Sequence, residues 1–89
     1  MYYVYIIVEE KTGRKYIGST ADLKERIQRH NSKRSTFTSR GEFWKLIYYE
    51  AFIEKKNALR EEQFLKSGKG RERIKYLFEE TLSRLRKGG

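Results

Sequence analysis

The sequence predicts an α+β protein in which a small three-stranded antiparallel sheet packs with about three helices, in the order β-β-α-β-α-α. Two β-branched and aromatic segments near the N-terminus flank a glycine-containing turn, and a third follows in the middle of the chain. Helical composition and spacing fill most of the remaining sequence. At 89 residues the chain can build one modest core, so we expect a single domain over residues 1–89.

The first two strands are expected at residues 2–8 and 14–19, where β-branched and aromatic side chains predominate. The segment between them contains Gly13, at a place where a hairpin turn requires positive φ. A third strand is expected at residues 44–49, after a polar, basic loop at residues 33–42. These segments predict an antiparallel hairpin with one added strand.

A first helix is expected directly after the hairpin. It begins near Thr20, with Ser19 or Thr20 as its cap. Leu23 and Ile27 form its apolar stripe, and the helix ends at residues 31–32.

Two more helices are expected near the C-terminus. Residues 55–66 have helical composition, and the segment 67–70 is expected to break that helix. A final helix covers residues 71–86. Its apolar face consists of Ile74, Leu77, Phe78, Leu82 and Leu85.

The chain is strongly basic, with 21 Lys and Arg against 12 acidic residues, a formal net charge of +9 and a pI near 9.9. Such a balance is typical of a nucleic-acid partner, and an anionic membrane surface is the competing explanation. The absence of cysteine excludes a disulfide partner and thiolate metal sites. No apolar run is long enough for a signal sequence or a spanning helix, so we expect a soluble cytoplasmic protein without a membrane partner. The oligomeric state stays open, with a monomer as the simplest case.

Glu62 is not explained by a structural role alone. At about 100° per residue it falls between Ala58, Leu59 and Leu65, in the middle of the apolar arc of its helix. Burying an ionised carboxylate without a partner is unfavourable, so Glu62 should pair with a cation, be neutralised or bind a metal. Glu61 lies toward the edge of the arc and is expected to be solvated.

Arg26 and His30 stand at positions i and i+4, so they project from one face of the first helix. A guanidinium and an imidazole near the sheet suit phosphate binding and proton movement, because imidazole changes charge near neutral pH. The alternative is that His30 caps the C-terminal end of the helix, where the helix dipole favours a cation.

Tyr5 and Tyr16 lie on the two strands of the predicted hairpin, at positions that could face the same side of the sheet. Tyrosines in small sheets are commonly core residues or cross-strand pairs. Because this chain has seven tyrosines, that explanation stays open for these two.

In their order along the chain, these residues resemble the GIY-YIG nuclease family. Its pattern is a Gly-Ile-Tyr segment, then a Tyr-Ile-Gly segment, an Arg and a His on the following helix, and a Glu on a later helix. Here Tyr3-Val4-Tyr5 matches the first segment loosely and Tyr16-Ile17-Gly18 matches the second fully. The resemblance covers about residues 3–70 and is nearest to the small standalone members, which consist of the nuclease domain alone.

Two positions depart from the family pattern. Tyr3 and Val4 stand where the family has Gly and Ile. Several members also use an Asn beyond the catalytic Glu, whereas no Asn follows Asn57 in this chain.

The resemblance implies an endonuclease that hydrolyses DNA phosphodiester bonds with one Mg²⁺ or Mn²⁺ ion. Glu62 would hold the ion, and Arg26 would stabilise the negative charge that develops on the phosphate. Tyr5 and Tyr16 would position the attacking water, with Tyr16 taking its proton, and His30 would relay a proton or orient a tyrosine. The implied partner is DNA rather than RNA, recognised by structure rather than sequence, with DNA repair as the general setting.

A phosphate-binding surface is expected around this site, because cations cluster in the surrounding loops and helix ends. The residues assigned to nucleic-acid binding are Lys33, Arg34, Arg40, Lys66 and Lys69. Lys45, Lys55, Lys56 and Arg71 belong to the same cluster. Phe37 either stacks on a base or anchors its loop to the core.

Two other functions remain compatible with the sequence. A catalytically weak or inactive nucleic-acid-binding module would keep the same fold and charge. A basic ribosome-associated or RNA-associated protein would share the charge, but it gives no reason for Glu62 among apolar residues.

Overall fold

The computed structural model describes residues 1–32 and 43–86, and it has the predicted order β-β-α-β-α-α. The elements are β1 (Tyr2–Glu9), β2 (Lys15–Thr20), α1 (Leu23–Asn31), β3 (Trp44–Phe52), α2 (Lys55–Lys66) and α3 (Gly68–Arg86). The strands form one antiparallel sheet in the order β2-β1-β3. No described helix combines the length and the apolarity needed to cross a membrane.

β1 is the central strand, and its sequence explains this position. Val4, Ile6 and Val8 alternate with Tyr5 and Ile7, and all five are 0% exposed. A strand that is apolar on both faces must be covered on both. The hairpin to β2 turns at Gly13, whose φ of 77° is the positive value that was expected there.

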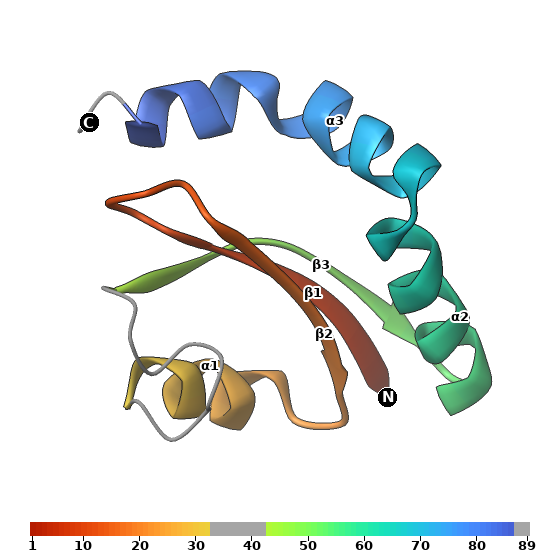
Figure 1. Ribbon diagram of the computed structural model, residues 1–89. Helices are drawn as coiled ribbons and strands as arrows, with labels where there is room; N and C mark the ends of the chain where they lie inside the picture. The colour runs from red at the N-terminus through yellow and green to blue at the C-terminus, as the bar shows by residue number, and fades with distance from the viewer. Residues whose placement is uncertain (33–42, 87–89) are drawn as a thin grey trace.

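Helices cover both faces of the sheet (Figure 1). On one face α1 packs over a cluster built on Tyr5, Ile7 and Trp44. On the other face α2 and α3 enclose a second cluster, whose buried members are Val4, Ile6, Ala58, Leu65 and Ile74. The sheet therefore forms the middle layer, and side chains of β1 and β2 can reach either helical layer.

The cap predicted for α1 was wrong. β2 continues through Thr20, and the residues expected to cap the helix, Ser19 and Thr20, pair with Val4 and Tyr3 of β1. Asp22 caps the helix instead, and its carboxylate accepts the Glu25 backbone N–H at 3.1 Å. The turn through residues 20–22 leaves Ser19 available for a contact with α2.

The break between α2 and α3 is shorter than predicted. Only Ser67 separates the two helices, and its hydroxyl accepts the Gly70 backbone N–H at 3.2 Å, which caps the start of α3. A Cβ on Gly70 would lie 2.0 Å from the Phe64 carbonyl oxygen, so glycine is needed where the two helices meet.

The final helix only partly presents the predicted apolar face. Ile74 is buried and Phe78 packs on the sheet, whereas Leu77 is 44% exposed. The helix is kinked at Phe78, where φ is −121°. Because of this kink, the residues before and after Phe78 do not follow the regular 3.6-residue spacing on which the predicted apolar face was based. The side chains of Leu82 and Leu85 lie outside the described residues.

Candidate active site

Two tyrosines and a histidine meet on the face of the sheet covered by α1. Tyr5 pairs with Gly18 and Ile7 pairs with Tyr16, so Tyr5 and Tyr16 are diagonal neighbours on one face, as expected, with ring centroids 6.2 Å apart. The hydroxyl of Tyr5 lies 2.7 Å from Nε2 of His30, and the Tyr16 ring lies edge-on to His30 at 4.8 Å.

His30 is 1% exposed and lies in the last turn of α1, where the C-cap residue is Ser32. Its side chain is therefore a buried partner of the tyrosines and not the cap of the helix.

Gly18 explains why the rings can approach so closely. A Cβ at this position would lie 2.6 Å from the Tyr5 hydroxyl oxygen and 3.0 Å from Cε1 of Tyr16. A side chain there would have to displace one of the two rings. The glycine of the Tyr-Ile-Gly segment is therefore a spatial requirement of the tyrosine pair.

The buried surroundings keep the two hydrogen-bonded groups uncharged near neutral pH. Burial, followed by the effect of Tyr16, raises the pKa of Tyr5 above its ordinary value, although Arg26 acts in the opposite direction. Burial lowers the pKa of His30, and the charges of Arg26 and Arg29 lower it further. The bond thus joins a neutral phenol to a neutral imidazole. Tyr5 is unsuited to act as a base, and its suitable role is to position other groups.

Arg26 extends from α1, one turn before His30. It interacts with the Tyr5 hydroxyl through its charge and a side-chain hydrogen bond. Its Nε is buried, and no described residue accepts a hydrogen bond from it. A buried guanidinium N–H without an acceptor is costly in the free protein, and an anionic ligand would satisfy it.

Glu62 reaches the edge of β2 from α2. The hydroxyl of Ser19 donates to its Oε1 at 2.7 Å, and Nζ of Lys66 donates to its Oε2 at 2.6 Å. Burial by itself would raise the pKa of Glu62, but the hydrogen bonds from Lys66 and Ser19, with the charges of Lys66 and Arg26, lower it overall. The carboxylate is therefore ionised, and its side chain is 15% exposed. The cation pair considered from the sequence is present, with Lys66 as the cation.

Sequence reasoning missed Ser19 as a partner of Glu62, because it treated Ser19 as a helix cap. The alternation of β2 was the available signal. With Tyr16 and Gly18 on the α1 face, Ser19 must point toward the face covered by α2.

The expectation that Glu61 is solvated was wrong. Its carboxyl is partly buried and hydrogen-bonds to Glu50 of β3. That bond, burial and the charge of Glu50 together raise the pKa of Glu61 to about 7. The kink-bearing helix α3 contributes Arg73, whose charge acts in the opposite direction. Helical spacing placed Glu61 at the edge of the apolar arc but gave no information about β3, which packs there.

The structure describes only some of the residues predicted to bind nucleic acid. Lys66 and Lys69 are exposed, and Lys66 is engaged by Glu62. Three further predicted residues, Lys33, Arg34 and Arg40, lie outside the described residues, as does Phe37.

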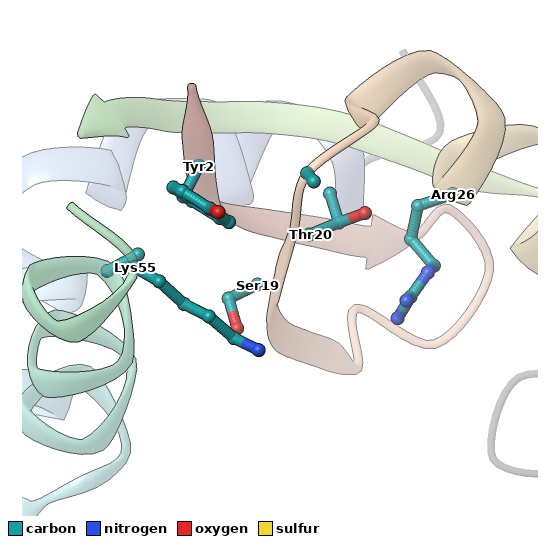
Figure 2. A pocket seen from close by; sticks show the side chains of 7 residues that line it. Tyr2, Ser19, Thr20, Arg26 and Lys55 are labelled. Carbon is teal, nitrogen blue, oxygen red and sulfur yellow. The ribbon is translucent and has the colours of Figure 1, made fainter. Parts of the chain in front are cut away.

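A pocket of about 230 Å³ opens between the end of β2, α1 and the start of α2 (Figure 2). Its lining consists of Tyr2, Ser19, Thr20, Arg26, Lys55 and two alanines. Ser19 connects it to Glu62, and Arg26 connects it to Tyr5. The pocket therefore borders the tyrosine pair and the carboxylate.

The donor set fits a hard divalent cation held by one protein carboxylate. Glu62 is ionised and partly accessible, and Ser19 orients one of its oxygens. Among the residues that the structure describes, no group of three or more His, Cys, Asp or Glu side chains could hold a metal. Water and a substrate phosphate would have to supply the remaining ligands, as is common for Mg²⁺.

Comparisons with known proteins agree with this arrangement. A family profile described as the GIY-YIG catalytic domain matches residues 1–76. Among curated proteins, a "UPF0213 protein in ldhD 5'region" from Pediococcus acidilactici is 37% identical over 65 residues, which cover 70% of this chain and 66% of that protein. A "UPF0213 protein" from Streptococcus pneumoniae is 35% identical over 86% of this chain and 78% of its own length.

A "UPF0213 protein" from Streptococcus agalactiae is 33% identical over 84% of this chain and 85% of its own length. The chain thus spans just under two thirds of the Pediococcus protein and more of the two streptococcal ones. No solved structure matches the chain. The profile covers most of the sequence, including β1, β2, α1 and α2 with every side chain of the described site, and on this ground the chain belongs to the GIY-YIG catalytic domain family.

Proposed function

We propose that this protein is a metal-dependent endonuclease that hydrolyses DNA phosphodiester bonds. The observation that carries the proposal is the convergence on the edge of β2 of an ionised carboxylate and a guanidinium with an unpaired buried Nε. Glu62 comes from α2 and Arg26 from α1, and Arg26 lowers the pKa of Glu62 through its charge. A core needs neither group there, whereas in phosphate hydrolysis a carboxylate can hold the metal ion and a guanidinium can stabilise the developing negative charge.

Glu62 would hold a single Mg²⁺ or Mn²⁺ ion. When bound, the ion supplies Lewis-acid polarisation of a phosphate oxygen. Ser19 fixes one oxygen of Glu62, so the carboxylate is oriented before any ligand arrives.

The remaining side chains support an in-line attack of water on phosphorus. The Tyr16 oxygen would accept the proton of the attacking water while its own hydroxyl proton passes to solvent. The P–O bond to the leaving oxygen breaks, and solvent supplies the proton that this oxygen takes up. Arg26 neutralises the charge that accumulates on the phosphate oxygens. Tyr5, neutral and bonded to His30, positions the water and the Arg26 guanidinium.

The family implies a nucleic-acid substrate, and the net charge of +9 suits a phosphate backbone. The described elements include no helix with the docking pattern of a groove-reading motif, so base-specific contacts are not expected from them. We therefore propose selection of branched, flapped or single-stranded DNA rather than of a particular sequence.

A second candidate is a nucleic-acid-binding module that does not cut. The contact between Lys66 and Glu62 favours it, because Lys66 satisfies the carboxylate oxygen that a metal would need. The two candidates differ in whether a divalent ion displaces Lys66.

The test is cleavage of labelled single-stranded, duplex and branched DNA in Mg²⁺, in Mn²⁺ and in EDTA. We expect wild-type cleavage that needs the ion and that Glu62→Gln abolishes, with folding and DNA affinity retained. Glu72→Gln, on the exposed surface of α3, is the matched control and should cut normally. Equal cleavage by wild type and Glu62→Gln would exclude the metal-ligand role, and binding without any cleavage would favour the second candidate.

A further inference from the structure

The pocket between β2, α1 and α2 contains two cationic side chains from different helices. Figure 2 shows Lys55 extending from α2 toward Ser19, while Arg26 enters the same region from α1. None of the described residues that line the pocket is acidic. The surroundings of the two cations therefore favour an anion.

The described residues do not fully satisfy either cation. Within the described part of the chain, Lys55 makes no hydrogen bond or ion pair, although its helix also carries the carboxylates of Glu61 and Glu62. The Nε of Arg26 is buried and lacks an acceptor among the described residues. Lys66, on the same helix, differs in this respect because Glu62 engages it.

The pocket adjoins the proposed reaction centre without containing it. Glu62 and Tyr16, the residues assigned to the ion and to the water, are not among its lining residues. Ser19 and Arg26 belong to both regions, since they contact Glu62 and Tyr5 respectively. A strand with its reacting phosphate between Tyr16 and Glu62 would thus carry a neighbouring phosphate past Arg26 toward Lys55.

We infer that this pocket binds the phosphate group next to the one that is cleaved, with Lys55 as its principal cationic contact. The inference rests on the proposed function for the position of the reacting phosphate. Lys55 is a binding residue in this scheme and takes no part in the chemical step. The aromatic ring of Tyr2, at the border of the pocket, suits the sugar between the two phosphates.

Lys56 provides a matched control one position along the same helix. Both lysines are exposed and both lie in the first turn of α2. Only Lys55 lines the pocket, because a step of one residue rotates the side chain by about 100° around the helix. A general attraction to DNA would involve both lysines, whereas a phosphate pocket involves only the first.

The experiment uses thymidine 3′,5′-bisphosphate, which carries two phosphates one nucleotide apart, and thymidine 5′-monophosphate as its single-phosphate counterpart. Binding is followed by NMR titration of the full chain in EDTA, so that no cleavage is required. Wild type should bind the bisphosphate about tenfold more tightly than the monophosphate, since hydrogen bonds to charged groups are worth this much. Lys55→Gln should remove this preference, and Lys56→Gln should retain it.

The outcomes separate this inference from the proposed nuclease activity. If the protein cuts no DNA but shows the Lys55-dependent preference, the pocket stands and the catalytic proposal fails. If the protein cuts DNA while wild type binds both nucleotides equally, the pocket is excluded and the catalytic proposal stands. Equal loss of the preference in Lys55→Gln and Lys56→Gln would also overturn the inference, because it would indicate diffuse attraction.

Discussion

The hydroxyl of Tyr5 and Nε2 of His30 lie 2.7 Å apart, although the two residues are 25 positions apart in the sequence and belong to β1 and α1. Both are almost completely buried. This contact links the central strand to the helix that carries Arg26, so the position of Arg26 depends on it. Its energy also depends on pH, because a protonated imidazole cannot accept the hydroxyl proton.

We expect His30 to make the protein less stable in mild acid. Because its pKa in the folded state is lower than 6.5, the unfolded chain takes up the proton first as the pH falls. The His30 contribution is therefore complete above about pH 6.5 and is lost as the pH drops below that value. Urea denaturation from pH 5 to 8 should show this decline in wild type, and His30→Gln should reduce it. If the unfolding free energy of His30→Gln declined with pH as steeply as that of wild type, His30 would have the same pKa in the folded and the unfolded chain.

Glu61 should have the opposite pH dependence. Its pKa of about 7 in the folded state exceeds the ordinary value of 4.5, so folding favours the protonated carboxyl. Its contribution is complete below about pH 4.5 and is lost as the pH rises through 7. Glu61→Gln keeps a hydrogen-bond donor toward Glu50 and removes the titration, so it should gain stability relative to wild type between pH 5 and 8. The same series of urea denaturations measures this gain. If the difference in unfolding free energy between the two proteins did not change with pH, Glu61 would not have the raised pKa described here.

Replacement of Gly18 by alanine should disturb the tyrosine pair. The added Cβ would meet the Tyr5 hydroxyl at 2.6 Å, and overpacking of this kind costs about 1–3 kcal/mol of unfolding free energy. Gly68→Ala is the control, because open space surrounds that position in α3. Thermal or urea unfolding should show destabilisation for Gly18→Ala and none for Gly68→Ala. Full stability with altered aromatic NMR signals would show instead that Tyr5 moves at little cost.

Tyr16→Phe should slow the chemical step and leave binding largely intact. The substitution keeps the ring beside His30 and removes only the hydroxyl assigned to the proton of the attacking water. The single-turnover cleavage rate should fall by roughly 10²-fold or more, while DNA affinity changes little. Tyr49→Phe is the control, because Tyr49 is 54% exposed and pairs with Tyr3 away from the site. A normal rate for Tyr16→Phe at saturating substrate and fixed Mg²⁺ would exclude Tyr16 as the base.

Removal of Lys66 should strengthen metal binding in the absence of DNA. Nζ of Lys66 lies 2.6 Å from Oε2 of Glu62, so a divalent ion must compete with it for this oxygen. Titration of Mn²⁺, followed by electron paramagnetic resonance, should give a dissociation constant several-fold lower for Lys66→Met than for wild type. Lys69→Met, which removes the same charge from exposed α3, controls for the general loss of repulsion. A weaker or unchanged affinity in Lys66→Met would show that Lys66 does not compete for Glu62.

The amino-acid sequence by itself determined the order and type of the elements, because β-branched runs, helical spacing and a turn glycine are local signals. Strand alternation and the turn at Gly13 allowed Tyr5 and Tyr16 to share one face, but the strand register that puts them there, with ring centroids 6.2 Å apart, came only from the structure. The unusual position of Glu62 also followed from the sequence, because helical spacing places its carboxylate among apolar residues.

The partners of these residues were decided only by the tertiary structure. Ser19 donates to Glu62 across 43 positions, and Glu61 shares a hydrogen bond with Glu50 of β3. Neither contact follows from periodicity, because a period gives the face of a helix or strand but not the element that packs against it. Because β2 extends through Thr20, Ser19 lies on the sheet edge that faces α2 and not at the predicted helix end. Long-range packing thus determined which side chains meet Glu62, and hence the chemistry open to the site.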